Sequence, residues 1–301
     1  MTTPLSGTQY DLVHGEYRAS IASVGATLRQ LTFAGRDLVT TFDADEVRPV
    51  FRGATLAPWP NRIVDGRYTF AGVEQQVALT EPGRSHALHG LVAWTAFEEV
   101  ESTESRVVLA TTIEAQDGYP HRVRVEVLFE LGDAGLYSAV TATNLGPTAA
   151  PWGTGPHPYL VAGEGTVDDW TLTLPTQQVL TVTPDRLIPI VAVSVDDTDF
   201  DFREPRAIGD TFIDHAFTGI VDARVTVSAP SGTGVVMFWD GACPWVQVHT
   251  ADQPDTASVR HRSGLAVEPM TCPPDAFNSG VDLIVLEPGA SSTAGWTIAN
   301  L

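Results

Sequence analysis

Short segments in which apolar and polar residues alternate with a period of two dominate the chain. The clearest is His121–Leu131, where every second residue from Val123 to Leu131 is apolar and most of the residues between them are charged. This alternation predicts a half-buried antiparallel strand. The turn residues Gly132–Gly135 follow, and Leu136–Thr143 reads as the returning strand.

Similar segments recur roughly every ten residues, separated by Gly, Pro, Asn and Asp. Together with a hairpin around Ala71 and Gly72, the predicted strands are Arg67–Phe70, Val73–Val77, Arg106–Ile113, Trp170–Leu174, Arg224–Ser228, Val235–Trp239, Val246–His249, Val281–Leu286 and Thr293–Ile298. No window of twelve or more residues has a convincing helical period. The pattern predicts an all-β protein, a large antiparallel sandwich or barrel-like fold, with residues 1–301 as a single domain.

Composition narrows the possible chemistry. The 301 residues carry 37 acidic and 17 basic side chains, a net charge of -20, which argues against nucleic acid and anionic membranes as partners. All the basic residues are arginine, so Schiff-base, pyridoxal phosphate and P-loop lysine mechanisms are excluded. Two cysteines without zinc spacing indicate neither a disulfide framework nor a structural metal. With no apolar leader and no run of membrane-spanning length, we expect a soluble cytoplasmic protein.

One carboxylate stands out. The apolar run Leu265–Val267 leads directly into Glu268, which precedes Pro269. A proline restricts the residue before it to extended geometry and tends to end regular pairing, so Glu268 is expected at the end of a strand. Desolvation there would raise the pKa of Glu268 toward the range useful for proton transfer. A solvated glutamate at a loop edge fits this stretch equally well.

Four other polar segments have both a chemical and a structural interpretation. Asn61 and Arg62 follow a proline–aromatic run, and Arg62 could bind hydroxyls or a carboxylate, or could fix a loop by bonding backbone carbonyls. His86 and His89 are three residues apart, but their flanks predict loop and strand, so we expect no metal there.

His157 lies between two prolines, which suits a positioned acid or base. Asp214 and His215 sit among apolar neighbours, where a polar pair is often structural.

In this order, the segments resemble the aldose 1-epimerase (galactose mutarotase) family over nearly the whole chain. The matching motifs are Asn61-Arg62-Ile63, Leu88-His89-Gly90, His157-Pro-Tyr159, Asp214-His215-x-Phe217, Pro244-x-Val246-Gln247, and Glu268 followed by Pro274-Asp275-Ala-x-Asn278. Each motif alone is weak, but six in collinear order on a β-rich chain are specific.

The resemblance implies a galactose mutarotase-like β-supersandwich and a cofactor-free, metal-free enzyme that interconverts the α and β anomers of an aldose. Glu268 then matches the base that takes the proton of the anomeric hydroxyl, and His157 the acid that protonates the ring oxygen. The productive state would have Glu268 ionised and His157 protonated. The resemblance also implies a set of residues that bind the sugar, namely Asn61, Arg62, His89, Tyr159, Asp214 and Gln247.

Other expectations concern the sugar. Sugar sites usually carry an aromatic platform, for which Trp59, Trp94 and Trp245 are candidates. The chain departs from common family residues at Leu91, Leu160 and Met270, which leaves the identity of the sugar open. The net charge and the absence of lysine favour a neutral sugar, and the chain is expected to act as a monomer or homodimer.

Two other function classes remain possible. One is a non-catalytic sugar-binding or sugar-sensing domain on the same scaffold, which needs hydroxyl donors but not both Glu268 and His157. The other is a glycoside hydrolase or lyase, which needs paired carboxylates that Glu268 and Asp214 could supply.

Overall fold

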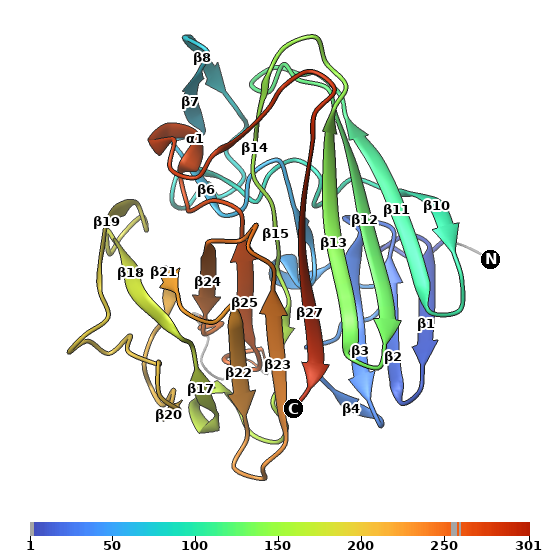
Figure 1. Cartoon of the computed structure of the whole chain (residues 1–301), viewed down its shortest axis with the longest axis vertical. Coiled ribbons are helices and arrows are strands. Elements are labelled where there is room, and N and C mark those ends of the chain that lie inside the picture. The colour runs from blue at the N-terminus through green and yellow to red at the C-terminus, as the bar shows by residue number, and fades with distance from the viewer. Residues whose placement is uncertain (1–2, 254–257, 259) are drawn as a thin grey trace.

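A nine-stranded sheet forms the largest layer of the protein in the computed structural model, which describes residues 3–253, 258 and 260–301. Its strands follow the order β10-β11-β12-β13-β27-β23-β22-β17-β20. Their bounds are β10 Glu98–Ser102, β11 Arg106–Ile113, β12 Val123–Gly132, β13 Gly135–Asn144, β27 Ser291–Asn300, β23 Gly234–Trp239, β22 Arg224–Ser228, β17 Thr171–Thr173 and β20 Arg206–Ala207. Figure 1 shows the long strands β12, β13 and β27 side by side at the middle of this layer.

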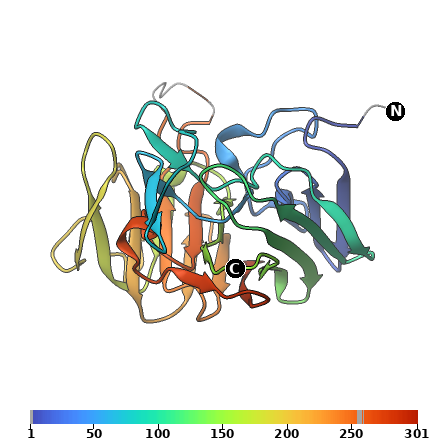
Figure 2. The same cartoon turned by 90° about the horizontal axis from the view of Figure 1, so that it is seen from above.

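A six-stranded sheet carries most of the polar motifs. Its order is β16-β25-β24-β21-β18-β19, and its bounds are β16 Tyr159–Leu160, β25 Leu265–Met270, β24 Trp245–His249, β21 Asp214–Ile220, β18 Thr176–Val182 and β19 Pro189–Ser194. A four-stranded N-terminal sheet contains β1 Gln9–His14, β2 Tyr17–Ala22, β3 Thr27–Phe33 and β4 Arg36–Asp37. Seen from above, the N-terminal and six-stranded sheets lie at opposite ends of the molecule (Figure 2).

Short strand pairs and helices complete the chain. They are β5 Thr55–Leu56 with β15 Gly155–Pro156, β6 Arg62–Val64 with β9 His86–Leu88, β7 Arg67–Phe70 with β8 Val73–Gln76, β14 Ala150–Trp152 with β26 Ile284–Leu286, the 3-10 helices η1 Pro49–Phe51 and η2 Val167–Asp169, and the single-turn helix α1 Ala276–Ser279. Every ladder is antiparallel, both within the larger sheets and within the short strand pairs, as the period-two alternation predicts. No helix among the described residues is long and apolar enough to cross a membrane.

The alternation along β12 has the predicted effect. Its valines, Phe129 and Leu131 are buried, while Arg124 and Glu126 on the other face are partly accessible. The return into β13 begins at Gly135, whose φ of 110° and close approach to the carbonyl oxygen of Ile298 leave no room for a side chain. The hydrophobic faces of the sheets therefore meet in one continuous core.

Three predictions of element boundaries need correction. The strand expected over Val281–Leu286 is shorter, Ile284–Leu286. Trp170 lies just before β17, since its amide belongs to the end of η2. Pro269 does not end regular pairing either, because β25 continues to Met270 and pairs with β24 from Ala266 to Met270. The strand tolerates this proline because β16 pairs only with Leu265 and Ala266 of β25. At Pro269 the edge of β25 on the side of β16 is unpaired, so no backbone amide is needed there as a hydrogen-bond donor to β16.

Candidate active site

A pocket of about 370 Å³ opens beside the six-stranded sheet and collects every predicted site residue. Its lining includes Asn61, Arg62, His89, His157, Tyr159, Asp214, Gln247 and Glu268. These residues come from six separate stretches of the chain. The antiparallel ladders and the loops at their ends bring them together.

Three neighbouring strands build the floor of the pocket. Gln247 on β24 is directly paired with Glu268 on β25 and, on its other side, with Ala216 on β21. The register places Gln247 and Glu268 side by side on one face of the sheet. Asp214, at the start of β21, accepts a hydrogen bond of 2.7 Å at Oδ1 from Nε2 of Gln247. The floor therefore presents a carboxylate, an amide and a second carboxylate in a row.

Glu268 and His157 face each other in this floor. Nε2 of His157 is 3.5 Å from Oε1 of Glu268, and the two side chains are 7% and 2% exposed. His157 lies between β15 and β16, with Pro156 and Pro158 on either side. Its ring stacks on Tyr159 at 5.2 Å and meets His89 edge-on at 4.9 Å. The aromatic contacts and the two prolines hold the imidazole in place.

Burial shifts the pKa values of both partners, and the rise for Glu268 is the one that the sequence predicts. Burial first, and then the charge of Asp214, raise the pKa of Glu268 well above its ordinary value, although Arg62 opposes them. Burial, followed by the charge of His249, lowers the pKa of His157 to about 3. Burial therefore disfavours the charged form of each partner in the empty pocket. The expected productive state, ionised Glu268 with protonated His157, contains both charged forms.

Several buried polar atoms in the pocket find no hydrogen-bond partner among the described residues. They are Nδ1 of His89, Nδ1 of His157, Oε1 of Gln247 and Oε2 of Glu268. Buried polar atoms are nearly always paired in native proteins. Four such atoms around one pocket indicate that a ligand, or water, completes their hydrogen bonding.

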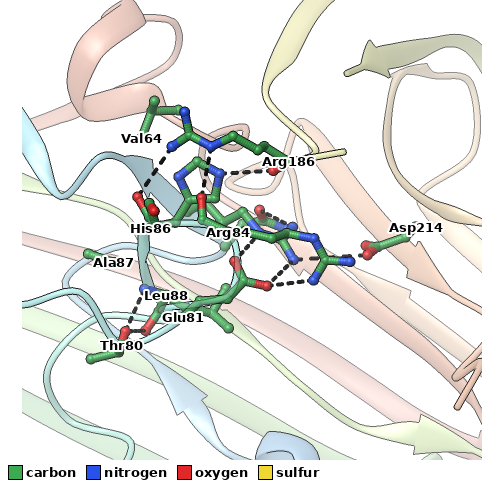
Figure 3. A network of polar contacts seen from close by, with 12 residues as sticks. Val64, Thr80, Glu81, Arg84, His86, Ala87, Leu88, Arg186 and Asp214 are labelled. Atoms are coloured by element: carbon green, nitrogen blue, oxygen red, sulfur yellow. Dashed lines mark hydrogen bonds and ion pairs between the residues drawn. The ribbon is translucent and has the colours of Figure 1, made fainter. Parts of the chain in front are cut away.

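Arg62 belongs to a paired network in the wall of the pocket. It donates to both oxygens of Glu81, from Nε at 2.8 Å and from Nη2 at 3.0 Å. Arg84 also donates to Oε1 of Glu81 at 2.8 Å, and Oδ2 of Asp214 lies 4.0 Å from Nη2 of Arg62 (Figure 3). Nη1 of Arg62 donates to Oδ1 of Asn61 at 3.3 Å. Of the two interpretations of Arg62, the structure supports a carboxylate-bound fork that lines the pocket, and none of these partners is a backbone carbonyl.

Glu81 is the main residue of the site that the sequence reading missed. It lines the pocket and directly precedes Pro82, the same arrangement that drew attention to Glu268. Phe51 and Phe212 also line the pocket, but an isolated phenylalanine in the sequence gives no comparable signal.

The backbone around the pocket is unusual. Phe51, Asn61 and His89 have positive φ values of 57°, 54° and 62°. Residues other than glycine rarely adopt this conformation, which persists where the surrounding structure enforces it and is common at functional sites.

The predicted tryptophan platform is wrong. Trp59 is buried and donates from Nε1 to the carbonyl oxygen of Ala87, and Trp245 donates to Asp282. Trp94 is 55% exposed but lies under Arg48 and outside the pocket. The aromatic residues that line the pocket, as far as it is described, are Phe51, Tyr159 and Phe212.

The departures from common family residues do not reach the pocket lining either. Leu160 and Met270 are fully buried, and Leu91 packs against the core. Since all three are packing residues, they do not bear directly on which sugar fits.

The histidine pair considered from sequence is also separated. His86 is buried on β9 and its Nε2 contacts the carbonyl oxygen of Arg186 at 2.8 Å. His89 instead meets His157 and Glu268, and one potential ligand atom from each lies within 4.8 Å of the others. These three residues could hold a metal ion.

The fold defines the class of protein first. The structure superposes on the GalM/aldose epimerase homologue from Caenorhabditis elegans with a TM-score of 0.85 at 20% identity, covering 98% of this chain and 99% of that one. It also superposes on the galactose 1-epimerase from Lactobacillus acidophilus NCFM with a TM-score of 0.82 at 17% identity, covering 97% and 94%. The predicted galactose mutarotase-like fold is thus confirmed.

Sequence comparison then gives the family. The model of the aldose 1-epimerase family matches residues 8–299, and the chain belongs to this family. Among curated proteins it is 37% identical over 286 residues to the uncharacterized protein YihR of Escherichia coli K12, covering 94% of this chain and 90% of YihR. The uncharacterized protein YphB of the same organism is 24% identical over 299 residues, covering 95% and 97%.

Proposed function

We propose that this protein is an aldose 1-epimerase, an isomerase that interconverts the α and β anomers of a neutral aldose without a cofactor. The observation that carries the proposal is the Glu268–His157 pair, 3.5 Å apart on the floor of a polar pocket, with the pKa of Glu268 raised and that of His157 lowered. A reaction that removes one proton and delivers another within the same sugar needs two such groups.

Ring opening then proceeds by two coupled proton transfers. Glu268 takes the proton of the anomeric hydroxyl, and His157 delivers a proton to the ring oxygen. The aldehyde rotates, and reclosure on its other face reverses both transfers. After ring opening Glu268 is protonated and His157 is neutral, which are the uncharged forms that burial favours.

Before ring opening, a proton must be transferred to His157 while Glu268 is ionised. Hydroxyls that hydrogen-bond to the unpartnered Oε2 of Glu268 and Nδ1 of His157 stabilise the charged forms of both groups and so favour the transfer.

The surrounding residues would bind the sugar hydroxyls and so position the anomeric carbon between Glu268 and His157. Gln247 and Asp214 on the floor and Asn61 and Arg62 in the wall can bond hydroxyls, and His89 offers its unpartnered ring nitrogen. Tyr159 donates its hydroxyl to the carbonyl oxygen of Val50 at 3.2 Å, so its ring would serve mainly to support His157.

The charges of the pocket favour a neutral sugar. Arg62 and Arg84, the arginines of the described lining, both bind the carboxylate of Glu81. Asp214, Asp252 and Glu268 add further acidic groups. An anionic sugar would therefore have to compete with Glu81 for both guanidinium groups.

The decisive experiment is mutarotation measured by polarimetry over a panel of neutral aldoses. We expect faster anomer exchange for at least one sugar, and its loss in Glu268→Gln. Glu98→Gln, an exposed glutamate on β10, is the matched control and should keep full activity. Sugar binding without exchange by the wild type would favour the sensing domain, and release of sugar from a glycoside would favour the hydrolase.

A further inference from the structure

The residues proposed for proton transfer also form a constellation that fits a different ligand. His89, His157 and Glu268 each place one potential ligand atom within 4.8 Å of the other two, and all three side chains are buried. Two imidazoles and one carboxylate facing an open cavity are a ligand set that divalent first-row transition metals bind.

The spacing is already close to what a metal requires. Ligands about 2.0–2.2 Å from a tetrahedral zinc ion lie roughly 3.4 Å apart. Nε2 of His157 and Oε1 of Glu268 are 3.5 Å apart, so these two can coordinate one ion with little movement. His89 lies within 4.8 Å of the other two and must move closer by at most about 1.4 Å. The pocket of about 370 Å³ leaves room for water or a sugar hydroxyl at the open positions.

The hydrogen bonding of these residues also supports metal binding. Nδ1 of His89, Nδ1 of His157 and Oε2 of Glu268 are buried and have no partner in the described chain. Because the second nitrogen of His157 and the second oxygen of Glu268 have no protein partner, no hydrogen bond from these atoms holds the two side chains against the small movement that metal binding requires. Metal-binding histidines, however, usually donate their second ring nitrogen to an acceptor that strengthens the site. A site without such acceptors should bind an ion reversibly rather than retain it.

We propose that His89, His157 and Glu268 form an inhibitory site for one divalent transition-metal ion such as Zn²⁺, which competes with the sugar. A bound ion would occupy the carboxylate and the imidazole that ring opening needs. The binding half of the proposal stands on the geometry alone, while the inhibition half rests on the proposed mutarotase activity. Mg²⁺ and Ca²⁺ prefer shells of oxygen ligands and should not bind here.

Binding is tested on the full chain after removal of metals with EDTA and gel filtration. Titration with ZnCl₂ by calorimetry should show one ion per chain with micromolar affinity, and CoCl₂ should give the visible absorption of a four- or five-coordinate ion. His89→Gln, His157→Asn and Glu268→Gln should each weaken binding at least about tenfold. His14→Ala is the control for surface binding, because exposed His14 contacts Asp133 at 2.8 Å far from the pocket, and it should bind like the wild type.

Inhibition is tested separately by polarimetry. Zn²⁺ should raise KM for the sugar without lowering kcat, and the sugar should weaken Zn²⁺ binding in the calorimeter. Absence of binding, unchanged binding in His89→Gln, or loss of binding in His14→Ala would overturn the site. Activation by Zn²⁺ would overturn the inhibitory role. If no sugar is turned over at all, the proposed function fails, while calorimetry and Co²⁺ absorption still decide whether the metal site exists.

Discussion

Two glutamates of the pocket, Glu268 in the floor and Glu81 in the wall, show how different surroundings separate two identical side chains. Each directly precedes a proline. Glu268 is 2% exposed and has an unpartnered oxygen, and its pKa is raised, chiefly by burial. Burial also raises the pKa of Glu81, but hydrogen bonds and charge from Arg62 and Arg84 outweigh it and leave that pKa lowered.

Because their pKa values are shifted in opposite directions, the two glutamates should have different roles. A carboxylate with a raised pKa and a free oxygen can exchange a proton with a ligand near neutral pH. A carboxylate that three guanidinium hydrogen bonds keep ionised cannot, but it can fix the orientation of Arg62. We therefore expect substitutions in the floor to remove chemistry and substitutions in the wall to loosen binding.

The largest effect should come from Glu268→Gln. Glutamine keeps the shape of the side chain but cannot accept the proton, so kcat should fall by about 10²–10⁴-fold while the sugar still binds. Polarimetry measures the rate, and calorimetry with the same sugar measures binding. Near-normal mutarotation by this variant would refute the role of Glu268.

His157→Asn should reduce kcat to a similar extent. Since both proton transfers belong to one ring opening, the double variant with Glu268→Gln should lose less than the product of the two single effects. Effects that multiply would show that the two residues act in separate steps.

The pH profile of kcat/KM should follow the protonation of Glu268 and His157, which together carry the one proton that ring opening needs. The pair loses this proton only when pH rises through the raised pKa of Glu268, so activity should fall there, about tenfold per pH unit. It gains a second proton only near the lowered pKa of His157, about 3. The profile should therefore stay flat through the mildly acidic range, and activity that declines as pH falls through the ordinary histidine value of about 6.5 would contradict the lowered pKa of His157.

The sequence predicted the fold and the eight site residues for two different reasons. Alternation along segments such as β11, which matches Arg106–Ile113, is a local property of the chain and can be read directly. The site residues came from collinear motifs, and the structure brings all of them into one pocket.

What the sequence could not supply depends on contacts between distant segments. Glu81 reaches Arg62 across 19 residues, and nothing local identifies that partner. The lowered pKa of His157 could not be read from the sequence either, because it follows chiefly from complete burial in a pocket that distant segments build. The tryptophans were misplaced because an aromatic residue in sequence gives no sign of whether it faces the pocket or the core.

A smaller effect is expected in the wall. Arg62→Ala should lower kcat/KM by about ten- to a hundredfold, since hydrogen bonds from a charged group contribute roughly 1.5–3 kcal/mol. Glu81→Gln should cost less, because Arg62 remains but loses its fixed orientation, and the loss should appear mainly in KM. Full activity of a folded Arg62→Ala variant would show that this arginine only holds the wall together.

The smallest effect separates the two glutamates by the sign of their contribution to stability. The folded pKa of Glu268 is raised, so its contribution is present below the unfolded value of about 4.3 and is lost as pH rises through the folded pKa. Glu268→Gln should therefore melt above the wild type by a few degrees near neutral pH, and the gap should grow with pH.

The folded pKa of Glu81 is lowered, so its contribution is present above about 4.3 and is lost as pH falls. Glu81→Gln should melt below the wild type near neutral pH, and the gap should close in acid. Melting curves of the three proteins across pH measure both gaps, and shifts of the same sign would show that the two carboxylates are not held in the opposite states that distinguish floor from wall.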